Sequence, residues 1–128
     1  MKSHSQVNSL LLLLIAAFFL ASCSKSTTAG LPSVTTNKVT NITSSSATTG
    51  GDVTADGGDP VTARGICIGL TTLPTITGSK TVNGTGLGTF TSSLTGLKSE
   101  ATYYVRAYAT NKLGTAYGNQ ETFTVLVP

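Results

Sequence analysis

The residues that could do chemistry are few in this chain of 128 residues. It has two cysteines, Cys23 and Cys67, and a single histidine, His4. Cys23 directly follows an apolar run and the small residues "LAS". It could be half of a disulfide, a reactive thiol or a site of modification, and each option leaves a different chemistry for the rest of the chain.

The N-terminal segment has the order of a secretory signal. Lys2 precedes an apolar stretch over residues 10–20, and small residues follow up to Cys23. The stretch is about a dozen residues long, whereas a helix that spans the bilayer core needs roughly 20. Residues 1–22 are therefore expected to be a signal peptide rather than a transmembrane helix.

The tetrad "LASC" at residues 20–23 resembles a bacterial lipobox. This resemblance implies that the Cys23 thiol is acylated, that the chain is cut before it and that the new amino terminus is acylated too. Residues 23–31 would then be a lipidated tether to a membrane. An Asp directly after the cysteine would resemble an inner-membrane retention signal, but this position holds Ser24. We therefore expect the outer membrane and leave open whether the protein lies on its surface or on its periplasmic face. The alternative is an ordinary signal peptide cut after Ser22, which leaves a free thiol.

Removal of residues 1–22 takes Lys2 and His4 with it. Lys+Arg then falls from 8 to 7 while Asp+Glu stays at 5, which gives a net charge of +2. These charges are scattered, so no nucleic-acid partner is expected. A mature chain without histidine has no His-dependent catalytic triad and no His-ligated metal site. A glycoside hydrolase needs two facing carboxylates, but the few acids lie mainly in turn-like stretches, so we expect no enzyme, metal or cofactor.

Cys67 would be the remaining cysteine with a free side chain. An acylated Cys23 cannot pair with it, so no intrachain disulfide is expected. Cys67 lies in the strand-like stretch "ARGICIG", where we expect a small buried hydrophobe. A reactive or intermolecular thiol is the alternative, although no activating base is adjacent.

Short runs of β-branched and aromatic residues, separated by turn signals, predict an all-β sandwich. A disordered Ser/Thr-rich stalk is the alternative. Strict alternation raises one question of register, because it points Val61 and Ala63 away from Ile66 and Ile68 unless a bulge near Gly65 switches faces. The expected strands cover residues 34–43, 47–55, 61–70, 80–82, 88–94, 102–111 and 116–125.

Two stretches could be interpreted as ligand sites, but turn chemistry explains them better. Asp56 and Asp59 in "ADGGDP" could form a carboxylate pair or bind calcium. Glycines and an aspartate that caps the backbone are, however, what a tight turn needs. The stretch "GTGLGT" at residues 84–89 lacks the third glycine of a phosphate-binding loop and leads into strand-like residues.

The stretch "LKSEATYYVRAYATN" carries the most information about both core and surface. With a period of two, the side chains expected to fill the core are Tyr103, Val105, Ala107 and Ala109. The opposite, outward set is Tyr104, Arg106 and Tyr108. Flat aromatic surfaces beside a guanidinium suit stacking on sugar rings or a hot spot for a protein partner, so this set is a candidate binding face. The alternative is a solvated face whose residues are favoured only by β-propensity.

The chain resembles the fibronectin type III-like modules of surface and lipid-anchored proteins of Bacteroidetes-type bacteria, in the segments "SSSATTGGDVTADGGDPVTARGICIG", "GTGLGTFTSSLTGL", "ATYYVRAYATN" and "GTAYGNQETFTV". The resemblance implies an all-β fibronectin type III or immunoglobulin-like β-sandwich of about seven strands over residues 32–127, without catalytic residues. Tyr103 follows Leu97 by six positions, a spacing that resembles the structural tyrosine corner of such modules. Ile68 departs from the family, which usually has Trp after the Cys. The expected core is Val34, Val53, Ile66, Leu94, Leu97, Tyr103, Val105 and Phe123.

These observations favour a lipid-anchored cell-envelope protein. Its single non-catalytic module would serve in binding or adhesion, with a protein or carbohydrate partner. The alternative is a structural spacer or assembly subunit of the outer membrane or periplasm with no external ligand. The residues do not separate these two functions.

Overall fold

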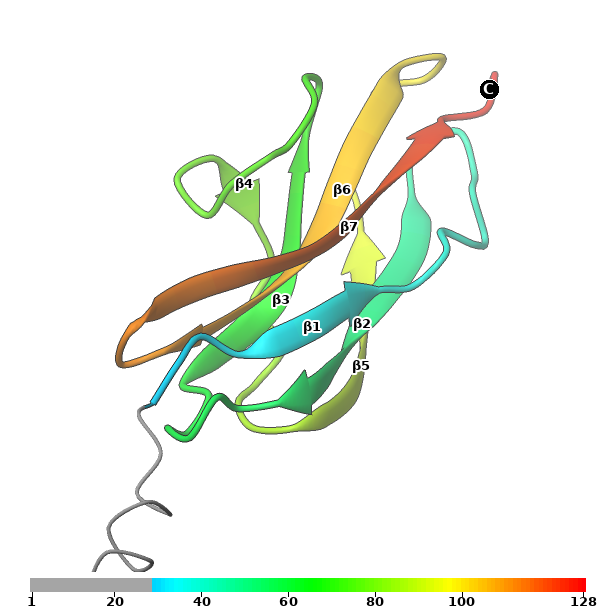
Figure 1. Cartoon of the computed structure of the whole chain (residues 1–128). Helices are drawn as coiled ribbons and strands as arrows, with labels where there is room; N and C mark the ends of the chain where they lie inside the picture. Colours follow the sequence, from blue (N-terminus) through cyan, green and yellow to red (C-terminus); the bar gives the residue numbers. More distant parts are fainter. Residues whose placement is uncertain (1–28) are drawn as a thin grey trace, which may run out of the picture.

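The computed structural model describes residues 29–128, which form a β-sandwich of two antiparallel sheets (Figure 1). Residues 1–28 lie outside the described residues. They include the predicted signal peptide, Cys23 and most of the predicted tether. One sheet has the strand order β1-β2-β5 and the other β4-β3-β6-β7. The all-β sandwich predicted from the sequence is therefore confirmed. Its seven strands are β1 (Ser33–Thr36), β2 (Ala47–Ala55), β3 (Ala63–Gly69), β4 (Ser79–Lys80), β5 (Gly88–Leu94), β6 (Thr102–Asn111) and β7 (Gly114–Thr124).

The predicted bounds of β2, β5 and β6 agree with the structure, whereas those of the other strands differ. The strand predicted over residues 34–43 is too long, because β1 ends at Thr36 and the chain then meets β2 only through an isolated bridge between Thr40 and Thr48. Asn41 beyond it has a φ of 50°, which no strand residue adopts. β4 is also shorter than predicted, and after it residues 81–84 continue along β3 through separate backbone hydrogen bonds.

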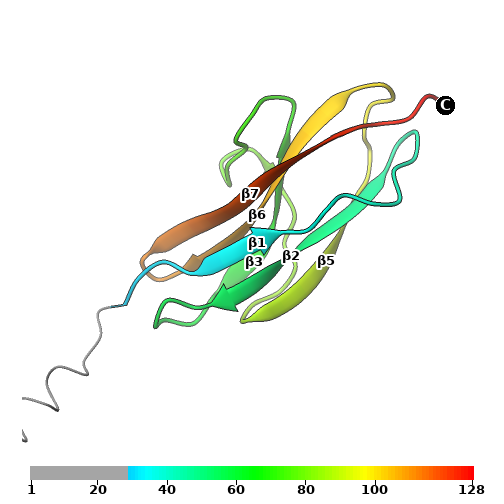
Figure 2. The same cartoon turned by 45° about the vertical axis from the view of Figure 1, so that its right-hand side comes forward.

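The two ends of the sandwich carry different parts of the chain (Figures 1 and 2). The N-terminal end holds residues 29–32, the β2–β3 loop and the β6–β7 turn. The amide of Gly30 donates to the carbonyl of Gly57 at 2.7 Å, and Asn111 Nδ2 donates to the carbonyls of Gly30 and Asp56. The C-terminal end holds the β1–β2, β3–β4 and β5–β6 loops together with residues 125–128. The chain therefore reaches the sandwich at the end opposite to its own C-terminus.

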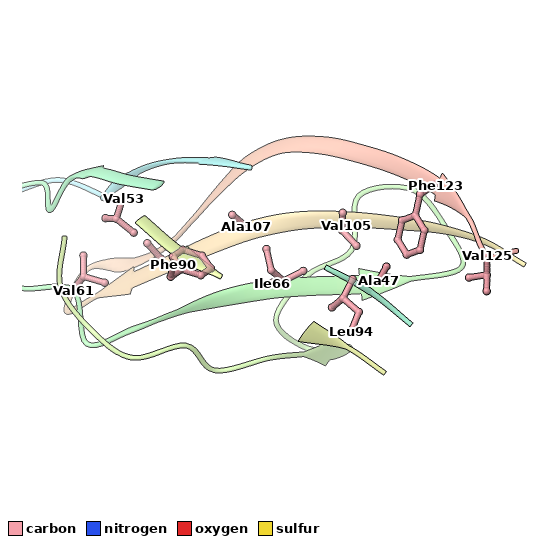
Figure 3. Packing of buried hydrophobic residues seen from close by; sticks show 11 residues of the cluster. Ala47, Val53, Val61, Ile66, Phe90, Leu94, Val105, Ala107, Phe123 and Val125 are labelled. Carbon is pink, nitrogen blue, oxygen red and sulfur yellow. The ribbon is translucent and has the colours of Figure 1, made fainter. Parts of the chain in front are cut away.

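The core lies between the two sheets and is built from modest side chains (Figure 3). Of the predicted core, Val34, Leu97 and Tyr103 are only partly buried and pack against its margin, and the other five residues are buried. Ala107 and Ala109, also expected in the core, are buried, whereas the sequence analysis did not name Ala47, Val61, Phe90 and Val125. The buried apolar cluster is Ala47, Val53, Val61, Ile66, Phe90, Leu94, Val105, Ala107, Ala109, Phe123 and Val125.

No bulge occurs near Gly65, so the bulge considered from the sequence is wrong. β3 pairs with β6 in unbroken register from Ala63 opposite Thr110 to Gly69 opposite Tyr104. Val61 precedes β3, so the alternation of that strand does not determine which way its side chain points, and the side chain is buried. The register shift lies instead between Arg106 and Tyr108, where β6 pairs with β7.

Because the pairing of β6 and β7 is shifted, the backbone amide of Ala107 is free to form a hydrogen bond across the sandwich. Ala107 N–H donates to Thr36 Oγ1 at 2.9 Å, and Thr36 N–H donates to Asn119 Oδ1 at 2.9 Å. A Cβ at Gly118 would lie 2.7 Å from Thr36 Oγ1, so the close approach of β1 to β7 requires glycine there. Thr36 thus joins the three-stranded sheet to the four-stranded one at this edge.

Thr81 makes the corresponding connection at the opposite edge. Its hydroxyl accepts from Ile66 N–H at 3.0 Å and from Ser92 Oγ at 2.8 Å, and donates to Asn83 Oδ1 at 2.7 Å. Its carbonyl accepts the hydroxyl of Tyr108 at 2.6 Å. Within residues 29–128 every buried side-chain nitrogen and oxygen has a partner. Both edges are therefore closed by satisfied polar groups.

The row of small residues on the outer face of β3 matches the large residues of β6. The cross-strand pairs are Gly65 with Tyr108, Cys67 with Arg106 and Gly69 with Tyr104. Cys67 is a free cysteine with 0% exposure, so the predicted small buried hydrophobe is confirmed. Burial raises the pKa of its thiol to about 11, although the positive charges of Arg106 and Lys80 act in the opposite direction.

We predict that Thr36→Val lowers the free energy of unfolding by about 1 to 3 kcal/mol, because the shape is kept while the buried amide of Ala107 loses its acceptor. The measurement is urea-induced unfolding. The matched control is Thr54→Val, since the Thr54 hydroxyl makes only an exposed 3.4 Å contact with the Ser33 carbonyl. Equal losses in the two variants would contradict the proposed connection.

We predict that alkaline pH weakens the fold through Cys67. The pKa of the folded thiol is about 11 against an ordinary 9.0, so its contribution is complete below pH 9.0 and is lost as pH rises towards 11. The loss should be about 1.4 kcal/mol at about pH 10 and should reach about 2 to 3 kcal/mol only above about pH 11. Urea unfolding at about pH 7 and about pH 10 measures it, with Cys67→Ala as the reference, because this variant lacks the thiol and the smaller effect of Cys67 on the pKa of Tyr108 but keeps the other titrating groups. An identical alkaline loss in Cys67→Ala would refute the assignment.

Candidate binding surfaces

Tyr108, predicted to be exposed on the candidate binding face, is 1% exposed, so that prediction is wrong. It does lie on the outer side of β6, but its ring folds over Gly65 on β3, where a Cβ would be 3.0 Å from Tyr108 Cε1 and 2.1 Å from the Thr81 carbonyl oxygen. The glycine leaves the space that the ring occupies. Burial, and secondly the neighbouring Cys67, raise the pKa of the Tyr108 hydroxyl. Tyr108 is buried, and its ring is not accessible to a ligand.

Arg106, the second predicted binding residue, fastens the loop between β3 and β4, residues 70–78. Its Nε and one terminal nitrogen donate to the Pro74 carbonyl at 3.0 and 2.8 Å, and the same terminal nitrogen lies 3.4 Å from the Leu73 carbonyl. Its guanidinium lies 4.1 Å from the ring centre of Tyr117 on β7. The prediction of a guanidinium free to meet a ligand is therefore wrong.

Two residues that the sequence analysis did not single out complete this attachment. Tyr117 Oη accepts the amide of Ile76 at 3.1 Å, and Gln120 Oε1 accepts the amide of Leu73. Residues 70–78 thus cover part of the outer face of β6 and β7. Tyr104 is half-buried, as is Arg106. The outer face of β6 therefore holds the loop of residues 70–78 in place and is not an open binding surface.

The other sequence-predicted residues have local structural contacts. Tyr103 Oη accepts the amide of Lys98 at 3.1 Å, and its ring stacks on Phe123 with centres 5.8 Å apart. Leu97 N–H donates to the Ser45 carbonyl, so the β5–β6 loop is tied to the β1–β2 loop. Together these contacts brace the C-terminal end of the sandwich.

The acidic and glycine-rich stretches form turns. Asp56 Oδ1 accepts the amide of Gly58 at 2.8 Å, and Gly84, Gly86 and Gly88 all have positive φ. Among residues 29–128 no three potential ligands gather in a group that could hold a metal ion. No helix in that range is long and apolar enough to cross a membrane.

A groove opens between the sheets near the C-terminal end. It has a volume of about 470 Å³, and a smaller hollow of about 190 Å³ shares its residues Ile68, Ser79, Thr95 and Leu97. Apolar walls come from Ile68 and Leu97, with Tyr103 at one side. The groove exists because β4 is only two residues long and the polar closure at Thr81 begins beyond it. This groove was not predicted, since it depends on which strands pair.

The groove borders an apolar surface formed by the loop of residues 70–78. Leu70 lines the groove and is 62% exposed, and Leu73 in the same loop is 60% exposed. Leu73 has a φ of 54°, a conformation that costs a leucine free energy, and its backbone is held there by Gln120 and Arg106. The loop is therefore fixed in one shape with two leucines turned outward.

Comparison with known proteins identifies the fold. No family model and no curated protein matches the chain. Among solved structures, the sensor domain of the anti-sigma factor RsgI4 of Pseudobacteroides cellulosolvens aligns with a TM-score of 0.57 and 17% identity, over 79% of this chain and 100% of that one. The sixth fibronectin type III domain of human fibronectin type III domain containing protein 3 aligns with a TM-score of 0.58 and 22% identity, over 81% and 94%.

A third solved structure agrees with these two. The fibronectin type III domain of human collagen XX aligns with a TM-score of 0.53 and 18% identity, over 78% of this chain and 97% of that one. Sequence identities this low support a shared fold, but they do not support a shared function or ligand. The described chain is a fibronectin type III-like β-sandwich, as the sequence predicted.

Proposed function

We propose that this chain is a lipid-anchored protein of the cell envelope whose single fibronectin type III-like module binds a partner without catalysing a reaction. The groove between the sheets carries the proposal, because it is the place where apolar side chains line a hollow on an otherwise hydroxyl-rich surface. A catalytic role has no support among residues 29–128, since Cys67 is buried, Asp56 caps a turn and no three His, Cys, Asp or Glu residues gather in one place. The resemblance of its sequence to modules of Bacteroidetes-type lipoproteins agrees with this proposal.

An extended segment of a protein is the partner that the groove fits best. Its walls combine Ile68 and Leu97 with the hydroxyls of Ser79 and Thr95, which suits apolar side chains on a hydrogen-bonding backbone. A sugar would need an open aromatic face, but the Tyr103 ring is stacked on Phe123. Among the two kinds of partner expected from the sequence, the groove therefore favours a protein.

The proposed site lies at the end of the sandwich opposite to Gly30. A protein attached through Cys23 at the outer membrane would hold its N-terminal end towards the lipid and present the groove away from it. The groove would remain accessible on either side of that membrane. Its partner would be an external protein in one case and an envelope protein in the other.

We predict that fatty-acid labelling marks the wild-type protein and that Cys23→Ala abolishes the label, because the acylated thiol is gone. Protease treatment of intact cells then determines the side of the membrane. Digestion indicates the cell surface, whereas protection until the outer membrane is opened indicates the periplasm and the structural role. A wild-type protein without label would refute the anchor.

We predict that Leu70→Glu weakens partner binding roughly tenfold or more, because a charge at the rim must lose water when the groove is covered. The matched control is Val82→Glu, since Val82 is 69% exposed but does not line the groove. A photoreactive residue at either position, activated in living cells, identifies the partner, whose affinity for both variants is then measured. Equal cross-linking and equal affinity at the two positions would contradict the proposed site.

A further inference from the structure

Three exposed leucines gather at the N-terminal end of the sandwich. Leu31, Leu87 and Leu113 are 50%, 56% and 53% exposed. Leu31 lies against the β6–β7 turn, because a Cβ on Gly114 would be 3.2 Å from Leu31 Cδ2. Leu87 ends the connection that leads into β5, at the same end of the molecule (Figures 1 and 2). About half of each leucine side chain therefore remains exposed at this end of the sandwich.

The backbone at this end is fixed, so these leucines have a defined direction. Asn111 is buried and holds Gly30 and the β2–β3 loop through Nδ2, while its Oδ1 accepts the amide of Leu113 at 2.9 Å. Arg64 donates to the carbonyls of Gly86 and Leu87 and lies 5.3 Å from the ring centre of Phe90. The loop tips therefore form one rigid end.

The length of chain before Gly30 determines what this end must face. Seven residues, 23–29, separate it from the proposed lipid attachment, and they span at most about 25 Å even when fully extended. β7 with its 11 residues is longer, at about 36 Å. A molecule attached through Cys23 therefore keeps its N-terminal end near the bilayer. The tether is too short to bring the C-terminal end to the bilayer as readily as the N-terminal end.

The charges at this end nearly balance. Among the described residues Lys112 and Arg64 stand against Asp56 and Asp59, two positive and two negative groups, and Lys25 of the predicted tether adds one positive charge. Attraction to anionic lipid would thus be small, and burial of apolar surface would supply the binding free energy.

We infer that the N-terminal end is a membrane-contacting surface, in which Leu31, Leu87 and Leu113 enter the interfacial layer of the bilayer that holds the lipidated Cys23. This inference rests on the proposed lipid anchor. The contact fixes the orientation of the module, so that its groove points away from the membrane. Because the charges nearly balance, the contact persists in uncharged phosphatidylcholine and at high salt.

The test uses tryptophan fluorescence, since the chain contains no tryptophan. The full-length protein is purified from cells as Leu113→Trp and, as a matched control at the other end, Leu73→Trp; both positions are exposed. Each is reconstituted into phosphatidylcholine vesicles with or without bromine on the acyl chains. Leu113→Trp should be quenched roughly twofold or more by bromine, and Leu73→Trp should be unaffected. Adding Leu31→Ser and Leu87→Ser to Leu113→Trp should reduce the quenching.

Mass spectrometry of the vesicle-bound protein separates the two ways of failing. Acyl chains on Cys23 with no difference in quenching between Leu113→Trp and Leu73→Trp would overturn the membrane contact and leave the anchor intact. Absence of acyl chains would overturn the anchor and this inference with it. Quenching that disappears at high salt would overturn the apolar mode of contact.

Discussion

The hydrogen bonds of Thr81 close one edge of the sandwich, and much of the remaining structure depends on them. Its backbone amide donates to the carbonyl of Ile66 while its hydroxyl accepts the amide of the same residue. Ser92 of β5 donates to that hydroxyl, and Tyr108 of β6 donates to the carbonyl. One residue outside any strand thus joins three strands from both sheets. Without it, β4 would be too short to keep β5 against β3.

The closure by polar groups follows from the composition. Only 39% of the residues are hydrophobic, the chain has no tryptophan, and two of its four phenylalanines, Phe18 and Phe19, lie in the predicted signal peptide. A core this light leaves hydroxyl groups inside, where each must find a partner or lose free energy. Thr36 and Ser92 are buried, and both are bonded across the gap between the sheets. Threonine and serine therefore link the sheets where larger apolar residues are absent.

The sequence was sufficient to predict what depends on local pattern. Alternation identified β6 and its inner face, and the turn-forming residues bounded β2 and β5. Alternation also placed Arg106 and Tyr108 on the outer side, but it could not say what would cover them. The cover is the loop of residues 70–78, which carries no periodic pattern, and its contacts with Tyr117 and Gln120 join segments about 40 residues apart. The spacing of Gly65, Cys67 and Gly69 was a signal, yet it becomes readable only once β3 is known to pair with β6.

The same pairing explains why the groove and the leucine-rich end lie apart. The longer antiparallel strands β2, β3, β6 and β7 run along the sandwich, so each end collects loops from both sheets. Asn111 holds the N-terminal end together, whereas Arg106 and Tyr103 brace the C-terminal end. A bilayer contact at one end therefore leaves the groove geometrically free at the other. In the proposed arrangement, the rigid strands between the two ends would give a membrane-attached module a fixed direction for binding.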